Sequence, residues 1–263
     1  MLETANIHSL ASLRRIHVVT RYTLGEVLHL RLLYLLLLVD GGLLFVAWQV
    51  REFNFGAAAA KFLSDFGLGA IGLSGMLLAA LLTGQLFFNS IADGTVCFQL
   101  TRAVRRWEFV WGRFLGIAAA LALFSAVSAL LLGCLLTGQR GWSGGLIGTV
   151  PVFCYAVAVL WLKMTLVAAM TLLVCSYASS ALFASGAGLL LAMLGHLRPL
   201  AEEMVGAHWF RVWPNFALFD VEVIMTVGQL PSGVTMLAML VYWSGYVVIL
   251  GQLAVFVFKR REF

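Results

Sequence analysis

Two ionisable residues interrupt long apolar stretches of this sequence. Asp40 follows a run of leucines, and Lys163 lies among valine, leucine, tryptophan and methionine. If these runs are membrane helices, each charge at mid-bilayer costs about 2.5–3.5 kcal/mol on insertion scales, so neither side chain should face lipid. We expect either a structural ion pair that joins the two helices, or cavity-lining residues that contact a substrate.

A serine between glycines is the other candidate for chemistry. The sequence Gly72-Leu73-Ser74-Gly75 resembles the G-x-S-G around the nucleophile of rhomboid-type intramembrane proteases, and His196 is expected at a similar depth. Nucleophilic catalysis requires the serine and its base within hydrogen-bond reach. Because the chain contains 26 glycines, the alternative is that this segment is a helix-packing face. No spacing of cysteines and histidines indicates a metal site.

The composition predicts the elements that hold these residues. Hydrophobic residues make up 62% of the 263 positions and charged residues only 11%, whereas a soluble domain carries roughly a quarter charged residues. A membrane span needs about 20 mostly apolar residues, and six stretches qualify. We therefore predict an all-α, polytopic membrane protein that forms one domain over residues 1–263. The predicted spans are residues 32–50, 67–88, 114–136, 150–175, 180–197 and 236–258.

The segments between the spans predict how the chain lies in the membrane. Eleven of the 17 lysines and arginines lie on the side that holds both termini, and five lie on the other, so we expect both termini in the cytoplasm of a prokaryote. The net charge of +5 thus reflects topology, and we expect no nucleic acid partner. Residues 11–30 predict an N-terminal interfacial helix, and aromatic residues in 198–235 predict short re-entrant outer helices.

The connector between the second and third spans, residues 89–113, is polar and charged. Its Arg102, Arg105, Arg106 and Glu108 are suited to docking in a partner's groove through charge-assisted hydrogen bonds. Trp107 and Phe109 would supply apolar anchors for the same contact.

This connector resembles that of ABC-2-type permeases, the transmembrane subunits of one class of ABC exporter. It departs from the family pattern at Ala103, where proline is usual, at Arg105, where serine or threonine is usual, and at Arg113, where lysine is usual. Weaker similarity lies at Glu26 with Arg31 and at the outer segment Trp213, Pro214, Asn215 and Phe216. The matching connector residues are Asp93, Gly94, Thr95, Leu100, Thr101, Val104, Arg106, Trp107, Glu108, Gly112 and Gly116.

The resemblance implies a lipid-embedded permease that works by alternating access with a second copy or a homologous permease. A separate cytoplasmic ATPase would hold ATP and Mg²⁺, because this sequence has no P-loop, and the chain would bind no cofactor. Two alternatives are a protease that uses Ser74 and His196, and a membrane anchor for an ATPase without transport. The implied ATPase-coupling residues are Asp93, Gly94, Thr95, Arg102, Arg105, Arg106, Trp107, Glu108 and Arg113.

Overall fold

The computed structural model describes residues 2–50, 59–92, 105–137, 146–205, 213–221, 225 and 229–260, and their regular structure is entirely helical. Six of these helices are long and apolar enough to cross a membrane, which confirms the prediction of an all-α chain with six spans. They are α2 (Arg31–Val50), α3 (Ala59–Ala92), α5 (Arg106–Thr137), α6 (Leu146–Cys175), α7 (Ala181–Val205) and α9 (Gly233–Lys259).

Several helices extend beyond the predicted spans, both at the connector and elsewhere: α3 begins at Ala59, before the predicted residue 67, and α7 continues to Val205, past residue 197. Helix α3 continues to Ala92 and α5 begins at Arg106, so both flanks of residues 89–113 are helical. The boundary between the fourth and fifth spans is a short turn after Cys175, in which the Ala178 amide donates to the Val174 carbonyl at 2.9 Å. We call the end of the bundle where α3 ends and α5 begins the connector end.

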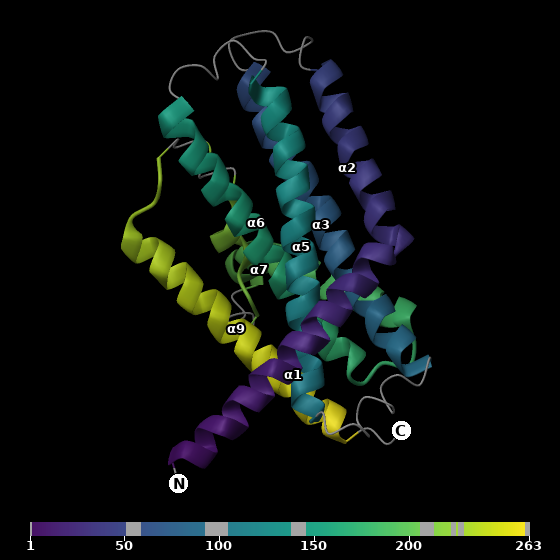
Figure 1. Cartoon of the computed structure of the whole chain (residues 1–263). Coiled ribbons are helices and arrows are strands. Elements are labelled where there is room, and N and C mark those ends of the chain that lie inside the picture. The colour runs from purple at the N-terminus through teal and green to yellow at the C-terminus, as the bar shows by residue number, and fades with distance from the viewer. Residues whose placement is uncertain are drawn as a thin grey trace.

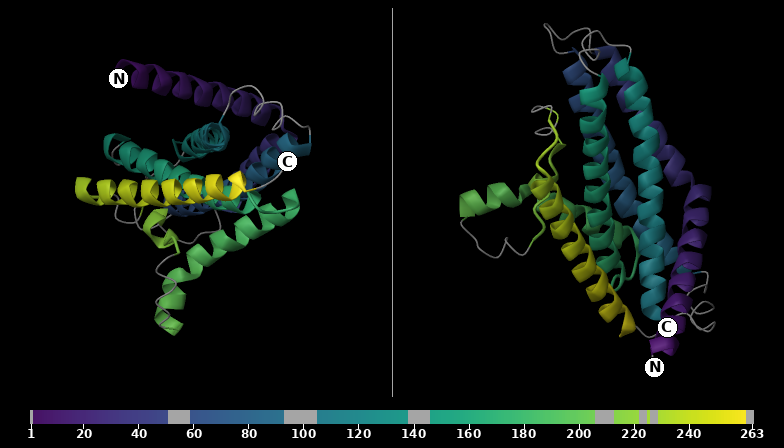
Figure 2. Two further views of the ribbon diagram at one scale, coloured as in Figure 1. Left: turned by 90° about the horizontal axis from the view of Figure 1, so that it is seen from below. Right: turned by 60° about the vertical axis from the view of Figure 1, so that its left-hand side comes forward.

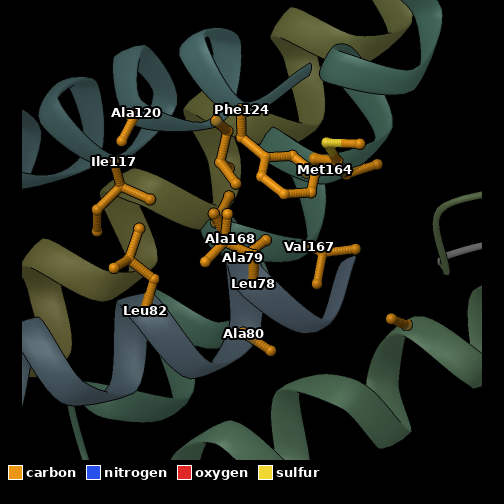
Figure 3. Packing of buried hydrophobic residues seen from close by; sticks show 14 of the residues in the cluster. Leu78, Ala79, Ala80, Leu82, Ile117, Ala120, Phe124, Met164, Val167 and Ala168 are labelled. Atoms are coloured by element: carbon orange, nitrogen blue, oxygen red, sulfur yellow. The ribbon is translucent and has the colours of Figure 1, made fainter. Parts of the chain in front are cut away.

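The centre of the bundle is formed by α3, α5 and α6. Side chains from these three helices meet between their axes, as Figure 3 shows for Leu78, Phe124 and Met164, which are all buried. Small residues such as Ala79 and Ala168 separate the larger ones and let the helices approach. This dense packing supports the two central helices that also carry Ser74 and Lys163.

The outer surface of the bundle is apolar as well. Leu38, Leu182 and Val234 are 75%, 82% and 78% exposed, and they come from α2, α7 and α9. A protein in water rarely leaves large contiguous apolar patches uncovered. Their exposure on several spans therefore fits lipid as the surrounding solvent.

Helix α1 (Leu2–His29) runs obliquely across the connector end and packs on the start of α5 (Figure 1). The contact is close because Gly112 and Gly116, one turn apart on α5, have no side chains. A Cβ atom at Gly112 would lie 2.7 Å from Val19 Cβ, and one at Gly116 would lie 2.5 Å from Thr23 Cβ. The Thr20 hydroxyl also donates to the Gly112 carbonyl at 3.3 Å.

The opposite side of the bundle is less regular. Helix α7 contains Pro199, which removes a backbone donor and bends a helix, and its end projects sideways at about half the height of the bundle (Figure 2). The short 3₁₀ helix η4 (Phe216–Phe219) contacts both α6 and α7. These elements surround the middle of α6, where Lys163 lies.

Candidate functional site

The base of the connector is built around Glu108, a buried carboxylate in the first turn of α5. It is 1% exposed, and its Oε2 accepts from the Arg105 backbone N–H at 2.9 Å. A glutamate that reaches back to the residue before the helix is half of a capping box. Its Oε1 accepts from the Ser12 hydroxyl at 2.6 Å, and Arg15 Nη1 lies 3.7 Å from Oε2. Glu108 therefore caps α5 and binds it to α1.

Arg113 makes a second buried link one turn further along α5. Its side chain is 2% exposed, and Nη1 donates to Glu26 Oε2 of α1 at 2.5 Å. Its Nη2 donates to the Ser90 hydroxyl of α3. The guanidinium carbon lies 5.8 Å and 5.5 Å from the ring centres of Tyr22 and Phe109, within cation–π range. Three helices are thus joined by one arginine.

Helix α9 reaches the same place with its last turn. Arg106 Nη1 donates to the Phe258 carbonyl at 3.4 Å, where a cation also interacts favourably with the negative end of the helix dipole. The Phe258 ring lies 6.0 Å from that of Phe109 and 5.5 Å from that of Phe87. The base of the connector therefore holds α1, α3, α5 and α9 together.

The connector residues singled out from the sequence divide into three groups. Asp93, Gly94, Thr95 and Arg102 lie outside the described residues. Arg105 is exposed, and Arg106 and Trp107 are half-buried. Glu108, Phe109 and Arg113 are buried in contact with other helices of the same chain.

The ion pair between Asp40 and Lys163, one of two expected arrangements, is not formed. Asp40 is fully buried, and its Oδ1 accepts from the Ser74 hydroxyl at 3.0 Å. Ser128 lies beside it, yet Asp40 Oδ2 and Ser128 Oγ have no hydrogen-bond partner among the described residues. Asp220 is the acid that acts electrostatically on Lys163. The sequence could not show that α3 lies between the two charges.

Ser74 and His196 are also not joined by a hydrogen bond. The Ser74 hydroxyl is directed at Asp40 and at the Ala70 carbonyl oxygen, 2.7 Å away. The His196 Nδ1 lies 3.0 Å from the Ala192 carbonyl oxygen, and its ring packs edge-on against Phe216 with centres 5.0 Å apart. The serine faces α2, whereas the histidine faces η4.

A cavity of about 300 Å³ is lined by several ionisable side chains, and we call it the charged pocket. Asp65 of α3, Lys163 of α6, His196 of α7 and Asp220, just after η4, line it together with apolar side chains. The Lys163 ammonium lies 6.0 Å from the centre of the Phe216 ring. Lys163 thus lines a cavity, as the second expected arrangement required, but without Asp40.

The predicted outer segment forms a wall beside this pocket. The Trp213 indole donates to the Leu191 carbonyl at 3.1 Å, and the Asn215 backbone N–H donates to the Tyr242 hydroxyl at 2.7 Å. The Asn215 side chain accepts from the Ala217 N–H at 3.0 Å and so caps η4. Pro214 and Phe216 are both buried. These contacts fix Phe216 against Lys163 and His196.

Sequence reasoning did not find Asp65 and Asp220 as neighbours of Lys163, nor Glu26 as the partner of Arg113. A weak signal was present in each case, because an acidic residue beside an apolar stretch needs a partner. Among the described residues, no group of three or more histidine, cysteine, aspartate or glutamate side chains could hold a metal ion.

Comparison with known proteins identifies no relative of this chain. No protein-family model matches the chain, and no curated protein matches it in sequence. The resemblance to ABC-2-type permeases therefore stays a prediction from the sequence.

Proposed function

We propose that this chain is the permease subunit of an ABC exporter of the ABC-2 type, in the cytoplasmic membrane of a prokaryote. The contact between Glu26 and Arg113 carries the proposal. These residues belong to two separate segments that resemble the family, and they meet in an ion pair of 2.5 Å, in which Arg113 is buried and Glu26 is partly buried. A resemblance due to chance would not require the two segments to touch.

The same geometry supports a coupling role for the connector. Glu108 and Arg113 bind the start of α5 to α1 and α3, and Arg106 contacts the end of α9. Packed elements with two discrete arrangements can transmit a displacement between sites. A partner ATPase that moves the connector would therefore move four helices together, and in alternating access this motion changes the side to which the pathway opens.

The remaining parts of the proposal concern topology and assembly. Both termini would lie in the cytoplasm, α1 would lie in the inner interface, and the end of α7 with η4 would form the re-entrant outer part. A second copy or a homologous permease would complete the pathway among membrane lipids, while the ATPase would bind ATP and Mg²⁺. The apolar exposed faces of α2, α7 and α9 are compatible with this environment.

The proposal is tested by co-purification of the ATPase with the chain, and by the effect of a substitution at an exposed connector residue on the amount recovered. Tagged chain is purified from membranes of its own organism in an uncharged detergent. We expect an ABC ATPase with a P-loop to co-purify and to hydrolyse Mg-ATP. Arg105→Glu should reduce recovery about tenfold or more, because a charge reversal at an interface costs at least about 1.4 kcal/mol.

Arg14→Glu is the matched control for this test. Both arginines are exposed, neither side chain forms a hydrogen bond or ion pair within the described part of the chain, and both lie toward the connector end. Arg14→Glu should leave recovery unchanged. Absence of a P-loop ATPase, or equal recovery with both variants, contradicts the proposal.

A further inference from the structure

The charged pocket lies beside a second, apolar cavity. This second cavity, of about 450 Å³, runs between α3 and α7 and is lined almost entirely by apolar side chains. We call it the apolar groove. Leu73, Met76 and His196 line both cavities, so the two share a wall. Because Leu73 and Met193 of the groove are 58% and 60% exposed, a ligand can enter it sideways from the surrounding lipid.

Lys163 lacks an acceptor in this pocket. Its ammonium carries three donors, yet within the described residues it has no hydrogen bond and no carboxylate at ion-pair distance. Its contacts are the face of Phe216 and the more distant charge of Asp220. A cation inside a membrane protein is stabilised by pairing, and an anionic group of a ligand in the pocket would supply the missing acceptors.

The other walls of the pocket favour a positive charge. Asp65 and Asp220 would repel a ligand that carries only negative charge. A carbonyl oxygen can only accept, so His196 must donate from Nδ1 to the Ala192 carbonyl. The Nε2 of the neutral ring is then an acceptor. The pocket therefore offers one cationic donor, Lys163, and several hydrogen-bond acceptors on its other walls.

We propose that the two cavities together bind a zwitterionic amphiphile. The anionic group of its head lies at Lys163, its ammonium lies toward Asp65 and Asp220, and its hydrocarbon chain lies in the apolar groove. As a cargo site this deepens the permease proposal and rests on it, because it names the class of molecule that the exporter would move. The binding itself requires no ATPase.

Three probes with the same acyl chain test the proposal on the purified chain in an uncharged detergent, with native mass spectrometry as the readout. Lysophosphatidylethanolamine carries a phosphate and an ammonium, lysophosphatidylglycerol carries only the phosphate, and monoacylglycerol carries neither. We expect the zwitterionic probe to bind about tenfold more tightly than either of the others, since charge-assisted contacts contribute at both ends of its head group.

Variants separate the site from general lipid binding. Lys163→Met should lower affinity for the zwitterionic probe about tenfold, whereas Lys163→Arg should retain most of it. Lys61→Met, which removes the same charge from an exposed position on α3, should have no effect. Asp220→Asn should reduce the difference in affinity between the zwitterionic and the anionic probe.

Equal binding of the three probes, or binding unchanged by Lys163→Met, overturns the proposal and leaves only lipid coating the apolar surface. Because these measurements use the chain without an ATPase, such a failure does not affect the recovery test of the permease function. Conversely, if no ATPase co-purifies with the chain, the binding result still holds. Only the interpretation of the bound amphiphile as cargo is then lost.

Discussion

Replacing the two glycines of α5 that face α1 should loosen the connector end. A Cβ atom at Gly112 would lie 2.7 Å from Val19 Cβ, and one at Gly116 would lie 2.5 Å from Thr23 Cβ. Both distances are shorter than Cβ contacts in real proteins. Because the opposing atoms are attached directly to the α1 backbone, rotation of a side chain cannot relieve the clash, and α1 must move away.

The expected size of the effect follows from two opposing contributions. Overpacking costs about 1–3 kcal/mol per position, whereas alanine stabilises a helix interior relative to glycine by about 1 kcal/mol. The double variant Gly112→Ala/Gly116→Ala should therefore lose about 2 kcal/mol. For a chain of this length that corresponds to a melting temperature about 4–8 °C lower.

Thermal unfolding of the purified chain in an uncharged detergent measures this loss. Gly133→Ala is the control, because Gly133 lies on the same helix and a Cβ atom there meets no heavy atom within 4 Å. The control should therefore raise the melting temperature by about 2–4 °C. A double variant that melts at or above the wild-type temperature would refute the close packing of α1 on α5.

Two further predictions concern charged residues. Glu26→Ala should destabilise the chain by about 2–3 kcal/mol, because it leaves the buried Arg113 without its carboxylate partner. Glu202→Ala, which removes one partner of a partly exposed ion pair, should cost less than about 1 kcal/mol. Equal melting temperatures of the two variants would contradict this prediction. Asp40→Lys and Lys163→Asp should each lower the yield of monodisperse protein, and the double variant should not restore it, because the two residues have different neighbours. Asp40→Asn, whose side chain can still accept a hydrogen bond from Ser74, is the control and should express normally. Recovery of the yield in the double variant would contradict the separate placement of the two charges.

The spans could be predicted from the sequence because they depend on a local property. Runs of about 20 apolar residues have few alternatives to crossing a bilayer, and the predicted 150–175 and 236–258 lie within α6 and α9. The bounds of α3 and α5 were less accurate, because a helix can continue past the apolar stretch into water. Polar residues such as Asn89 and Arg106 end the hydropathy signal but not the helix.

The partners of the charged residues could not be predicted, because they depend on which helices are neighbours. Glu26 and Arg113 are 87 positions apart, and hydropathy does not indicate that α1 crosses α5. Asp40 and Lys163 were considered as a pair since both lie near the middle of spans. Their separation follows from the central position of α3, which contacts α2 on one side and α6 on the other.

The contact of α1 with α5 also sets the order of assembly during synthesis. Ser12 and Glu108 are 96 positions apart, so at about 5–20 residues per second the ribosome needs roughly 5–20 s to supply the partner of α1. During that interval α2 and α3 are already synthesised, and under the proposed topology α1 would lie in the membrane interface beside them. Its arginines on the connector-end side are suited to hold it at anionic lipid head groups until α5 arrives.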